Sequence, residues 1–365
     1  MKICFLTASM RAGGAERVMS ILANEFCKRG HDVSFIVTDD AKIIAYKLDE
    51  KVVIKYADTI TLRSISGLLS CSKSIDSCVK ELKPDVVITF FQSVIIPWLM
   101  TGNSIPLIFS ERNDPKNNNT GFMDRLMRVM VMHKAKGIVF QTKRVQNFFR
   151  CSIRKKSTVI MNPFDASKLP QRDTNKRVKE IVAVGRLTQQ KNYNLLLEAF
   201  VKVYEKHPDY CLRIYGVGPL KDELINNSIK LKISDAVHFM GVSNDVLNAI
   251  KNSSCYVLSS NYEGIPNALL EALALGLPCV TTDYLPEAVD EFVDNYINGV
   301  IVPRNNPQKM ADAINEIIED DEFAQLLGEK ASEIVATIRV EKIAKEWMRF
   351  IQSKLREGES VDCIE

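Results

Sequence analysis

The sequence comprises 365 residues, of which 46% are apolar and 25% are charged, a composition that is typical of a globular chain and excludes a low-complexity one. The net charge is only +3, but residues 1–170 carry +11 and residues 171–365 carry −8. The length predicts two domains, and the basic first half predicts an acidic partner: nucleic acid, anionic lipid or a phosphorylated substrate.

Cysteine and histidine usage indicates a reduced protein without a metal centre. The nine cysteines include no Cys-x-x-Cys pair, and the four histidines lie far apart. The longest apolar run, residues 86–100, is interrupted by Gln92, Ser93 and Pro97 and is too short to span a bilayer. Because the first residues are typical of a strand rather than of a signal peptide, we expect a cytoplasmic protein that binds no metal.

Strands and helices alternate in the first half of the sequence. Short apolar runs between turn residues predict strands at 3–8, 33–38, 52–56, 85–90, 106–110, 137–141 and 157–161. Helices are predicted at 15–29, 62–82, 122–135 and 143–149. This alternation is typical of a parallel sheet that helices cover on both faces.

A polar stretch that contains Pro163 and Pro170 separates this half from a second alternation. Here strands are predicted at 180–184, 211–215, 237–240, 255–259 and 278–282, and helices at 191–206, 219–230, 307–335 and 341–357. The sequence therefore predicts an α/β fold of two Rossmann-like parallel-sheet domains that face each other across a cleft. The expected parts are a domain at 1–165, a linker at 166–178, a domain at 179–340, and a C-terminal helix and tail at 341–365 that cross back to the first domain.

The segment 262–271 combines two glutamates with a predicted helix start. Pro266 fits the first turn of a helix because its missing N–H would be unpaired there, so the N–H groups of residues 267–269 are expected to be available to an anion. Glu263 and Glu271 flank this start, and a carboxylate can accept two hydroxyl groups at once. The segment thus suits a phosphate together with sugar hydroxyls; the alternative is a capped surface helix with an acidic first turn.

Gly13 and Gly14 follow the first predicted strand and precede a helix, which is where a parallel sheet places a ligand-binding loop. They do not form Gly-x-Gly-x-x-Gly, and Asp39 and Asp40 do not end the second strand cleanly, so the sequence disfavours NAD binding. The glycines would let a backbone N–H approach a substrate or phosphate. A plain tight turn is the alternative.

Arg186 and Lys191 lie on the loop after the first strand of the second half. Two cations that converge on a cleft can neutralise a diphosphate, and an arginine guanidinium can donate to two oxygens at once. Either residue alone would more often be a solvated surface charge. Both, however, lie at the same carboxyl edge of the predicted sheet as Glu263 and Glu271.

Three motifs in this order resemble the family-4 retaining glycosyltransferases of GT-B fold. They are Gly13-Gly14-Ala15-Glu16-Arg17, Gly185-Arg186-Leu187 with Lys191-Asn192, and Glu263 followed eight positions later by Glu271. The resemblance covers nearly the whole chain. Its variant motifs are similar to those of bacterial transferases that assemble O-antigen, capsule and other oligosaccharides.

The resemblance implies catalytic roles for Arg186, Lys191 and Glu263, in which the two cations neutralise the nucleotide diphosphate and Glu263 lies against the donor sugar. It implies that Glu271 binds the ribose. The glycine loop is expected to approach the diphosphate and the acceptor. The resemblance also implies that the N-terminal domain at 1–165 binds the acceptor and that the C-terminal domain at 179–340 binds the nucleotide sugar. Further substrate contacts are expected at Gly13, Gly14, Gly185, Gly218, Gly264, Ile265, Pro266, Asn267, Ala268 and Leu269. No metal or other cofactor is expected, because the cations and the helix start stabilise the leaving group.

Two segments depart from the family pattern. Many relatives carry a histidine near the donor sugar, whereas this chain has Arg112 in the corresponding stretch, so Glu111 or Arg112 is expected to contact the sugar or acceptor. Relatives often carry Gly-Gly-Pro-Glu after a late strand, whereas residues 283–287 read Asp-Tyr-Leu-Pro-Glu. We expect this loop to contribute differently to sugar or acceptor choice.

Basic and apolar side chains are interleaved along residues 122–156. The pattern suits nucleic acid, an anionic lipid leaflet or a lipid-linked diphosphate, and it also suits a solvated helix face. Because no nucleic-acid recognition motif accompanies it, we expect peripheral contact with the inner face of the cell membrane and no nucleic-acid partner. The predicted helix at 62–82 is a second candidate for that contact.

The resemblance implies metal-independent, retaining transfer of a hexose or N-acetylhexosamine from a UDP-sugar to a glycan acceptor, expected to be lipid-linked, during synthesis of a bacterial surface polysaccharide such as lipopolysaccharide. The alternatives are a UDP-sugar 2-epimerase of similar fold, an NAD-linked oxidoreductase and an inactive nucleotide-sugar-binding module. The sequence shows no pattern of His and carboxylates for proton abstraction. An inactive module is disfavoured because both cations and both glutamates are present.

Overall fold

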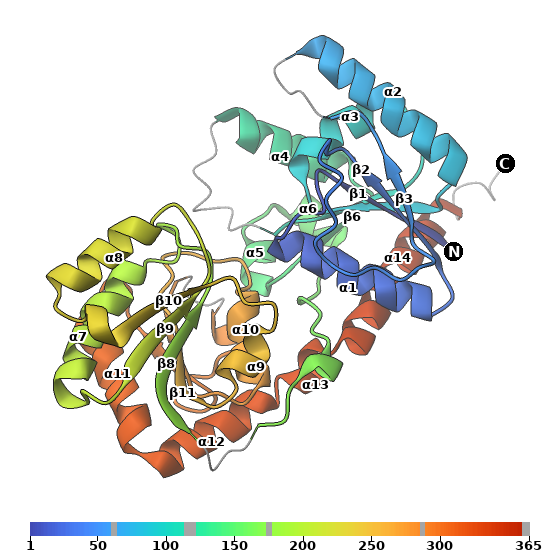
Figure 1. The fold of residues 1–365 in the computed structure, drawn as a ribbon. Coiled ribbons are helices and arrows are strands. Elements are labelled where there is room, and N and C mark those ends of the chain that lie inside the picture. The colour runs from blue at the N-terminus through green and yellow to red at the C-terminus, as the bar shows by residue number, and fades with distance from the viewer. Residues whose placement is uncertain (60–63, 113–121, 173–176, 285–288, 360–365) are drawn as a thin grey trace. The chain divides into compact units, whose positions relative to one another are not determined.

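The computed structural model describes residues 1–59, 64–112, 122–172, 177–284 and 289–359 (Figure 1). For residues 122–127, 358 and 359 it describes the backbone alone. The chain divides into two compact units. Unit 1 comprises Met1–Phe164 with Ile338–Glu365, and unit 2 comprises Asp165–Thr337.

Unit 1 is built on a seven-stranded parallel sheet with the order β3-β2-β1-β4-β5-β6-β7. The strands are β1 (Lys2–Thr7), β2 (Asp32–Val37), β3 (Val53–Tyr56), β4 (Val86–Thr89), β5 (Leu107–Ser110), β6 (Gly137–Phe140) and β7 (Ser157–Val159). The central strands are almost fully buried, as expected for a parallel sheet covered on both faces. The direction of strand order reverses between β1 and β4, where such sheets form their ligand crevice.

The helices of unit 1 cover this sheet. They are α1 (Gly14–Lys28), α2 (Ile65–Leu82), the 3₁₀ turn η1 (Gln92–Val94), α3 (Ile95–Met100), α4 (Phe122–Lys134), α5 (Lys143–Asn147), α6 (Cys151–Lys155) and α14 (Val340–Glu359). The last helix returns to this unit: Trp347 is fully buried in its core, and Arg29 donates to the carbonyl oxygen of Glu341 at 2.7 Å.

Unit 2 is built on a six-stranded parallel sheet with the order β10-β9-β8-β11-β12-β13. Its strands are β8 (Val178–Val184), β9 (Cys211–Tyr215), β10 (Val237–Gly241), β11 (Ser253–Leu258), β12 (Cys279–Thr282) and β13 (Val300–Val302). The reversal of strand order falls between β8 and β11. The two Rossmann-like sheets predicted from the sequence are thus confirmed.

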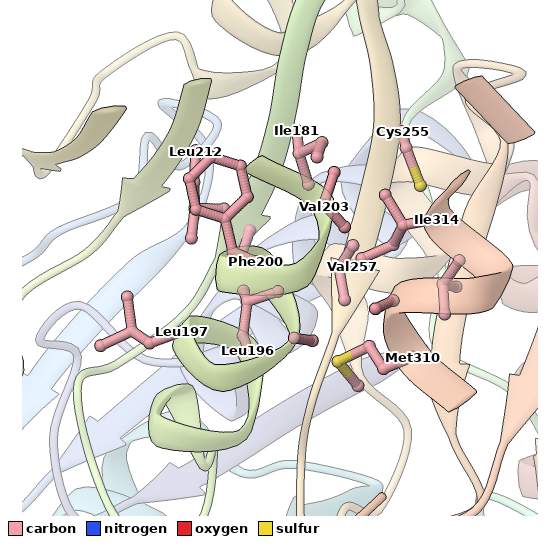
Figure 2. Packing of buried hydrophobic residues seen from close by; sticks show 14 of the residues in the cluster. Ile181, Leu196, Leu197, Phe200, Val203, Leu212, Cys255, Val257, Met310 and Ile314 are labelled. Carbon is pink, nitrogen blue, oxygen red and sulfur yellow. The ribbon is translucent and has the colours of Figure 1, made fainter. Parts of the chain in front are cut away.

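The helices of unit 2 are α7 (Tyr193–Lys206), α8 (Lys221–Lys230), α9 (Val246–Ile250), α10 (Asn267–Ala274), α11 (Pro307–Glu319) and α12 (Asp321–Ser332), with short α13 (Val335–Ile338) at the unit boundary and 3₁₀ turns η2 (Ala166–Lys168), η3 (Ser234–Ala236) and η4 (Val289–Glu291). Figure 2 shows Phe200 of α7 and Ile314 of α11 in one apolar cluster with Val257 of β11. This packing holds α7 and α11 against the sheet.

Two local expectations were wrong, and several short elements were not predicted. The predicted helix at 307–335 is two helices, because the Asp320 side chain accepts the N–H of Phe323 at 2.9 Å and starts α12 anew. The short strand β13 and the helices α3, α6, α9 and α13 were not predicted. The strand predicted at 157–161 ends at Val159. Elements of three to six residues carry too little periodicity to be recognised in the sequence.

Among the described residues, no helix is both long enough and apolar enough to cross a membrane. Nor do three or more His, Cys, Asp or Glu side chains of these ranges gather as they would around a metal ion.

Candidate active site

The centre of the candidate site is formed by two loops of unit 2 that follow neighbouring strands. Residues 185–192 follow β8 and residues 259–266 follow β11, and these strands flank the reversal of strand order. The carboxyl ends of parallel strands meet at one edge of the sheet. Motifs more than seventy residues apart in the chain are therefore brought together.

Backbone and side-chain hydrogen bonds hold the two loops to each other. Asn261 donates its backbone N–H to the carbonyl oxygen of Gln190 and its side-chain amide to that of Gln189, both at 2.8 Å. Ser259 donates to the carbonyl oxygen of Lys191, also at 2.8 Å. Asn192, with φ of 46°, donates to the Asn261 side chain at 3.0 Å. The loops thus form one structural unit at the sheet edge.

Lys191 and Glu263 form an ion pair in this unit, with Nζ and Oε1 2.5 Å apart. Only 14% of the lysine side chain and 8% of the glutamate side chain are exposed. The same Oε1 accepts the hydroxyl of Ser260 at 2.7 Å, and Oε2 accepts the amide of Gln190 at 3.2 Å. A carboxylate can accept about four hydrogen bonds, so three donors hold Glu263 in place and leave room for one ligand hydroxyl.

Three buried tyrosines lie around this pair. Burial, followed by the nearby Glu263 carboxylate, raises the pKa of Tyr193 and of Tyr284 above the ordinary value. Burial does the same to Tyr256, with smaller contributions from Glu263 and Glu271. The hydroxyls of Tyr256 and Tyr284 have no hydrogen-bond partner within the described part of the chain. These three tyrosines therefore stay neutral.

Glycines shape the first of the two loops. A Cβ at Gly185 would lie 2.9 Å from Lys191 Cε and 3.0 Å from Tyr193 Oη. A Cβ at Gly218 would collide with the backbone of Leu187. Larger side chains at these two positions would displace Lys191 or its loop, so both glycines are explained by close packing, and their predicted contact with substrate stays a prediction.

Helix α10 begins at Asn267 with Pro266 as its cap residue, as the sequence predicts. The N–H of Leu269, however, donates to the carbonyl oxygen of Pro266 at 3.0 Å. The expectation that this N–H is available to an anion was therefore wrong, because the first turn of the helix is tightened into an i to i+3 bond.

The other predicted residues of this edge differ in exposure. Glu271, on α10, is 5% exposed, and Ile265 is 8% exposed. Gly264 is half-buried. Arg186 is exposed, and its side chain makes no hydrogen bond or ion pair with any described residue. Arg186 is thus a solvated cation beside a lysine that is already paired.

In unit 1, Gly13 and Gly14 lie where β1 leads into α1. Gly14 is the first residue of that helix, and the hydroxyl of Tyr46 donates to the carbonyl oxygen of Gly13 at 3.0 Å. Ser9 donates to the carboxylate of Glu16 at 3.1 Å. The loop is therefore tied to its surroundings at the carboxyl end of β1.

Glu111 and Arg112 follow β5 and are both engaged within unit 1. Glu111 is 2% exposed and pairs with the equally buried Arg128 at 3.4 Å. The guanidinium of Arg112 stacks 3.8 Å from the centre of the Phe90 ring and donates to Asn162, and burial lowers its pKa to about 9, against the effect of Glu111. Contact of either residue with substrate stays a prediction. Of the 283–287 loop, residues 285–287 lie outside the described ranges.

Two family models match the chain. Residues 12–168 match the model described as Glycosyltransferase Family 4, and residues 166–334 match the model described as Glycosyl transferases group 1. The chain belongs to glycosyltransferase family 4. It is a retaining glycosyltransferase of GT-B fold, which confirms the resemblance seen in its motifs.

Relatives match over nearly their full length. An uncharacterized glycosyltransferase of Haemophilus influenzae is 28% identical over 340 residues, 92% of this chain and 95% of the relative. The N-acetylgalactosamine-N,N'-diacetylbacillosaminyl-diphospho-undecaprenol 4-alpha-N-acetylgalactosaminyltransferase of Campylobacter jejuni is 26% identical over 372 residues, 96% of this chain and 99% of the relative. A crystal structure of Anabaena Alr3699/HepE in complex with UDP and glucose superposes with a TM-score of 0.82 at 18% identity, covering 97% of this chain and 100% of that one.

Sequence reasoning missed the residues that support the Lys191–Glu263 pair of this family-4 enzyme. Gln190 and Ser260 hold the carboxylate, and Arg304, after β13, donates to the carbonyl oxygen of Asn261 at 3.3 Å. The sequence offered one signal for the first two, because Gln190 directly precedes Lys191 and Ser260 lies three positions before Glu263. Their partners become apparent only once β8 and β11 are known to be neighbours.

Proposed function

We propose that this glycosyltransferase moves a hexose or N-acetylhexosamine from a UDP-sugar to a glycan acceptor, lipid-linked in the cell, in the synthesis of a bacterial surface polysaccharide. The fold shared with HepE, whose crystal contains UDP and glucose, supports a UDP-sugar donor. The name of the Campylobacter relative, which describes an N-acetylgalactosaminyl transfer to a diphospho-undecaprenol acceptor, supports a lipid-linked acceptor.

The observation that carries this proposal is the buried Lys191–Glu263 pair, with the exposed Arg186 on the same loop as Lys191. A donor diphosphate placed against the start of α10 would contact the exposed guanidinium of Arg186 and the buried ammonium of Lys191. The lysine is a three-fold donor, so it can keep its bond to Glu263 while donating to a phosphate oxygen. Such preorganised charge stabilises a leaving group most where water is excluded.

The remaining roles follow from position. The free acceptor capacity of Glu263 suits a hydroxyl of the donor sugar, and Glu271 on α10 suits the ribose. In the transfer, the bond between the anomeric carbon and the phosphate oxygen breaks, and the acceptor hydroxyl bonds to that carbon on the same face. The departing phosphate takes the hydroxyl proton. Arg186 and Lys191 supply the positive charge for this step, so we expect the reaction to need no metal.

We further propose that unit 1 makes peripheral contact with the inner face of the cell membrane. Val129 and Met130 on α4 and Phe148 after α5 are exposed apolar side chains, and Lys143 and Arg150 nearby in sequence are exposed cations. Apolar side chains flanked by cations suit an anionic lipid surface. Co-sedimentation with anionic but not with neutral phospholipid vesicles is expected, and equal co-sedimentation with both would contradict it.

Thermal unfolding against UDP, GDP, ADP, CMP and NAD tests the donor assignment. A ligand that binds only the folded state raises the unfolding midpoint, so we expect a selective rise with UDP. A rise with GDP instead would keep the enzyme class and change the donor. A rise with NAD alone, or with none of the five, would contradict the proposal.

A further inference from the structure

A large cavity lies in unit 2 at the amino edge of the sheet, where its strands begin, opposite the edge that holds Lys191 and Glu263. Its volume is about 730 Å³, within the range of roughly 300–1,000 Å³ that is usual for small-molecule sites. Its walls come from residues that precede or begin β8, β9, β11 and β12 and from one face of α12. The residues that line it include none of those assigned to the donor.

Two arginines of this cavity, Arg172 and Arg177, are held by main-chain carbonyl oxygens. Arg172 donates to the carbonyl oxygen of Gly276, just after α10. Arg177 donates from Nη2 to the carbonyl oxygens of Ser254 and Ile317, at 3.2 and 3.1 Å. Cations are favoured beside the carboxyl ends of helices such as α10 and α11. A carbonyl group fixes a guanidinium in place without adding a formal negative charge.

Carboxylates do not balance the two guanidiniums equally. Arg177 forms an ion pair with Asp321 at 2.7 Å, and the carboxylate side chain is 91% exposed. Arg172 forms no ion pair with any described residue, and its Nε has no hydrogen-bond partner in the ranges that the structure describes. Burial, followed by the charge of Arg177, lowers the pKa of Arg172. An anion bound beside Arg172 would therefore offset the repulsion between two cations and accept from a guanidinium that is suited to phosphate oxygens.

The rest of the wall offers groups that bind hydroxyls. Lys179 pairs with Asp209, but both side chains are more than half exposed, and solvated pairs of this kind are weak. On α12, Gln325 donates to the carboxylate of Glu329 at 2.9 Å, which leaves acceptor capacity for ligand hydroxyls. A carboxylate repels a bare phosphate ion but accepts hydroxyl groups. The wall therefore suits an anion that also carries hydroxyl groups.

We propose that this cavity binds a small phosphate monoester that carries hydroxyl groups, with Arg172 as the main partner of the phosphate and Glu329 as an acceptor for the hydroxyls. The volume leaves room for a body of several carbon atoms beside the phosphate. This binding goes beyond the proposed transfer and does not depend on it. Because the two edges of the sheet are separate, the monoester and a UDP-sugar are expected to bind together.

Calorimetric titration of the whole protein, with and without saturating UDP, tests this proposal. The probes are glucose 6-phosphate and glycerol 3-phosphate, with glucose as the neutral control and inorganic phosphate as the bare anion. Gln325→Trp places a large side chain on the cavity wall, and Gln352→Trp, at an exposed position of α14, is its matched control. Arg172→Met removes the guanidinium, and Arg356→Met, also exposed on α14, is the corresponding control. Thermal unfolding reports whether each variant is folded.

We expect at least one of the two monoesters to bind the wild type and both controls at one site per chain, with the same affinity in the presence and absence of UDP. Folded Gln325→Trp is expected to lose this binding. Arg172→Met is expected to weaken it about tenfold or more, because charged hydrogen bonds are lost. Inorganic phosphate and glucose are each expected to bind more weakly than the monoester.

Several results would overturn the inference. They are a wild type that binds neither monoester, unchanged affinity in folded Gln325→Trp or Arg172→Met, competition between monoester and UDP, and affinity for inorganic phosphate or glucose equal to that for the monoester. A wild type that binds the monoester but not UDP would refute the proposed donor alone, so the two proposals fail separately.

Discussion

The carboxyl edges of the two sheets use charge in different ways. In unit 2, Lys191 and Glu263 reach each other across two loops, and Gln190 and Ser260 hold the carboxylate. In unit 1, Glu111 forms a buried ion pair with Arg128. The accessible polar groups at that edge are hydroxyl groups and the ion pair between Arg11 and Asp39. Among the described residues, the edge of unit 2 thus keeps an exposed cation without a side-chain partner, Arg186, whereas Arg11 at the edge of unit 1 is paired with Asp39.

The strongest way to break this comparison is to remove the cation of unit 2. We expect Lys191→Met to lower turnover about 100- to 1,000-fold, because loss of one preorganised donor to a leaving group has effects of this size. The variant is also expected to lose stability, because Glu263 keeps a buried, unpaired charge. Initial rates of UDP release and thermal unfolding measure the two effects.

Two further variants separate these effects. Lys191→Met combined with Glu263→Gln removes both charges and is expected to recover stability but not turnover. Lys206→Met, at an exposed position of α7, is the control. Wild-type turnover in Lys191→Met would refute the assigned role of the lysine.

Arg186 provides a second test of the role of positive charge in unit 2. We expect Arg186→Ala to lower kcat/KM for the donor about 10- to 100-fold, the usual range for a lost charged hydrogen bond. Because its side chain has no partner among the described residues, the unfolding midpoint should not change. Arg356→Ala, at an exposed position of α14, is the control, and equal kcat/KM in both variants would remove Arg186 from the site.

Glu271 tests whether the neutral part of the donor is also recognised in unit 2. We expect Glu271→Ala to weaken UDP binding about tenfold, measured by calorimetric titration, through loss of the acceptor for the ribose hydroxyls. The exposed Glu198 of α7 provides the control Glu198→Ala. Equal UDP affinity in wild type and Glu271→Ala would count against the ribose assignment.

The smallest effect on donor binding is expected in unit 1. Arg128→Leu removes the ion-pair partner of the buried Glu111 carboxylate, so we expect a loss of about 3 kcal/mol in the stability of that unit with unchanged UDP affinity. Adding Glu111→Leu should restore much of the stability. If Arg128→Leu instead weakened UDP binding as strongly as Glu271→Ala does, the assignment of UDP binding to unit 2 would be wrong.

The sequence predicted those features that spacing alone reveals. Glu263 precedes and Glu271 follows a helix start that Pro266 marks, and Arg186 and Lys191 follow a clear strand. Both motifs could therefore be placed at one sheet edge. The hydrogen bonds from Gln190 and Ser260 could not be predicted, because they depend on β8 and β11 being neighbours in the sheet. Local sequence patterns do not reveal the order of strands in a sheet. Arg304 was missed along with the three-residue strand β13 that positions it.

In unit 1, a motif position led to residues whose side chains are buried and paired. Glu111 and Arg112 were singled out because they occupy the place of a family motif, yet burial and pairing decide what a side chain can reach. The ion pair between Arg11 and Asp39 joins residues that follow β1 and β2, which α1 separates in the chain, and neither residue belongs to a recognised motif.

The central claim is that the Lys191–Glu263 pair of unit 2 serves transfer from a UDP-sugar. Its most direct test is UDP release from UDP-N-acetylgalactosamine and UDP-glucose, with a bacterial membrane extract as acceptor, by the wild type and by Lys191→Met combined with Glu263→Gln. We predict that the wild type forms UDP from at least one of the two UDP-sugars. The folded double variant is expected still to bind UDP, but to form UDP from the donor at least 100-fold more slowly. Equal release by both proteins, or a wild type that neither binds nor releases UDP, would contradict the account.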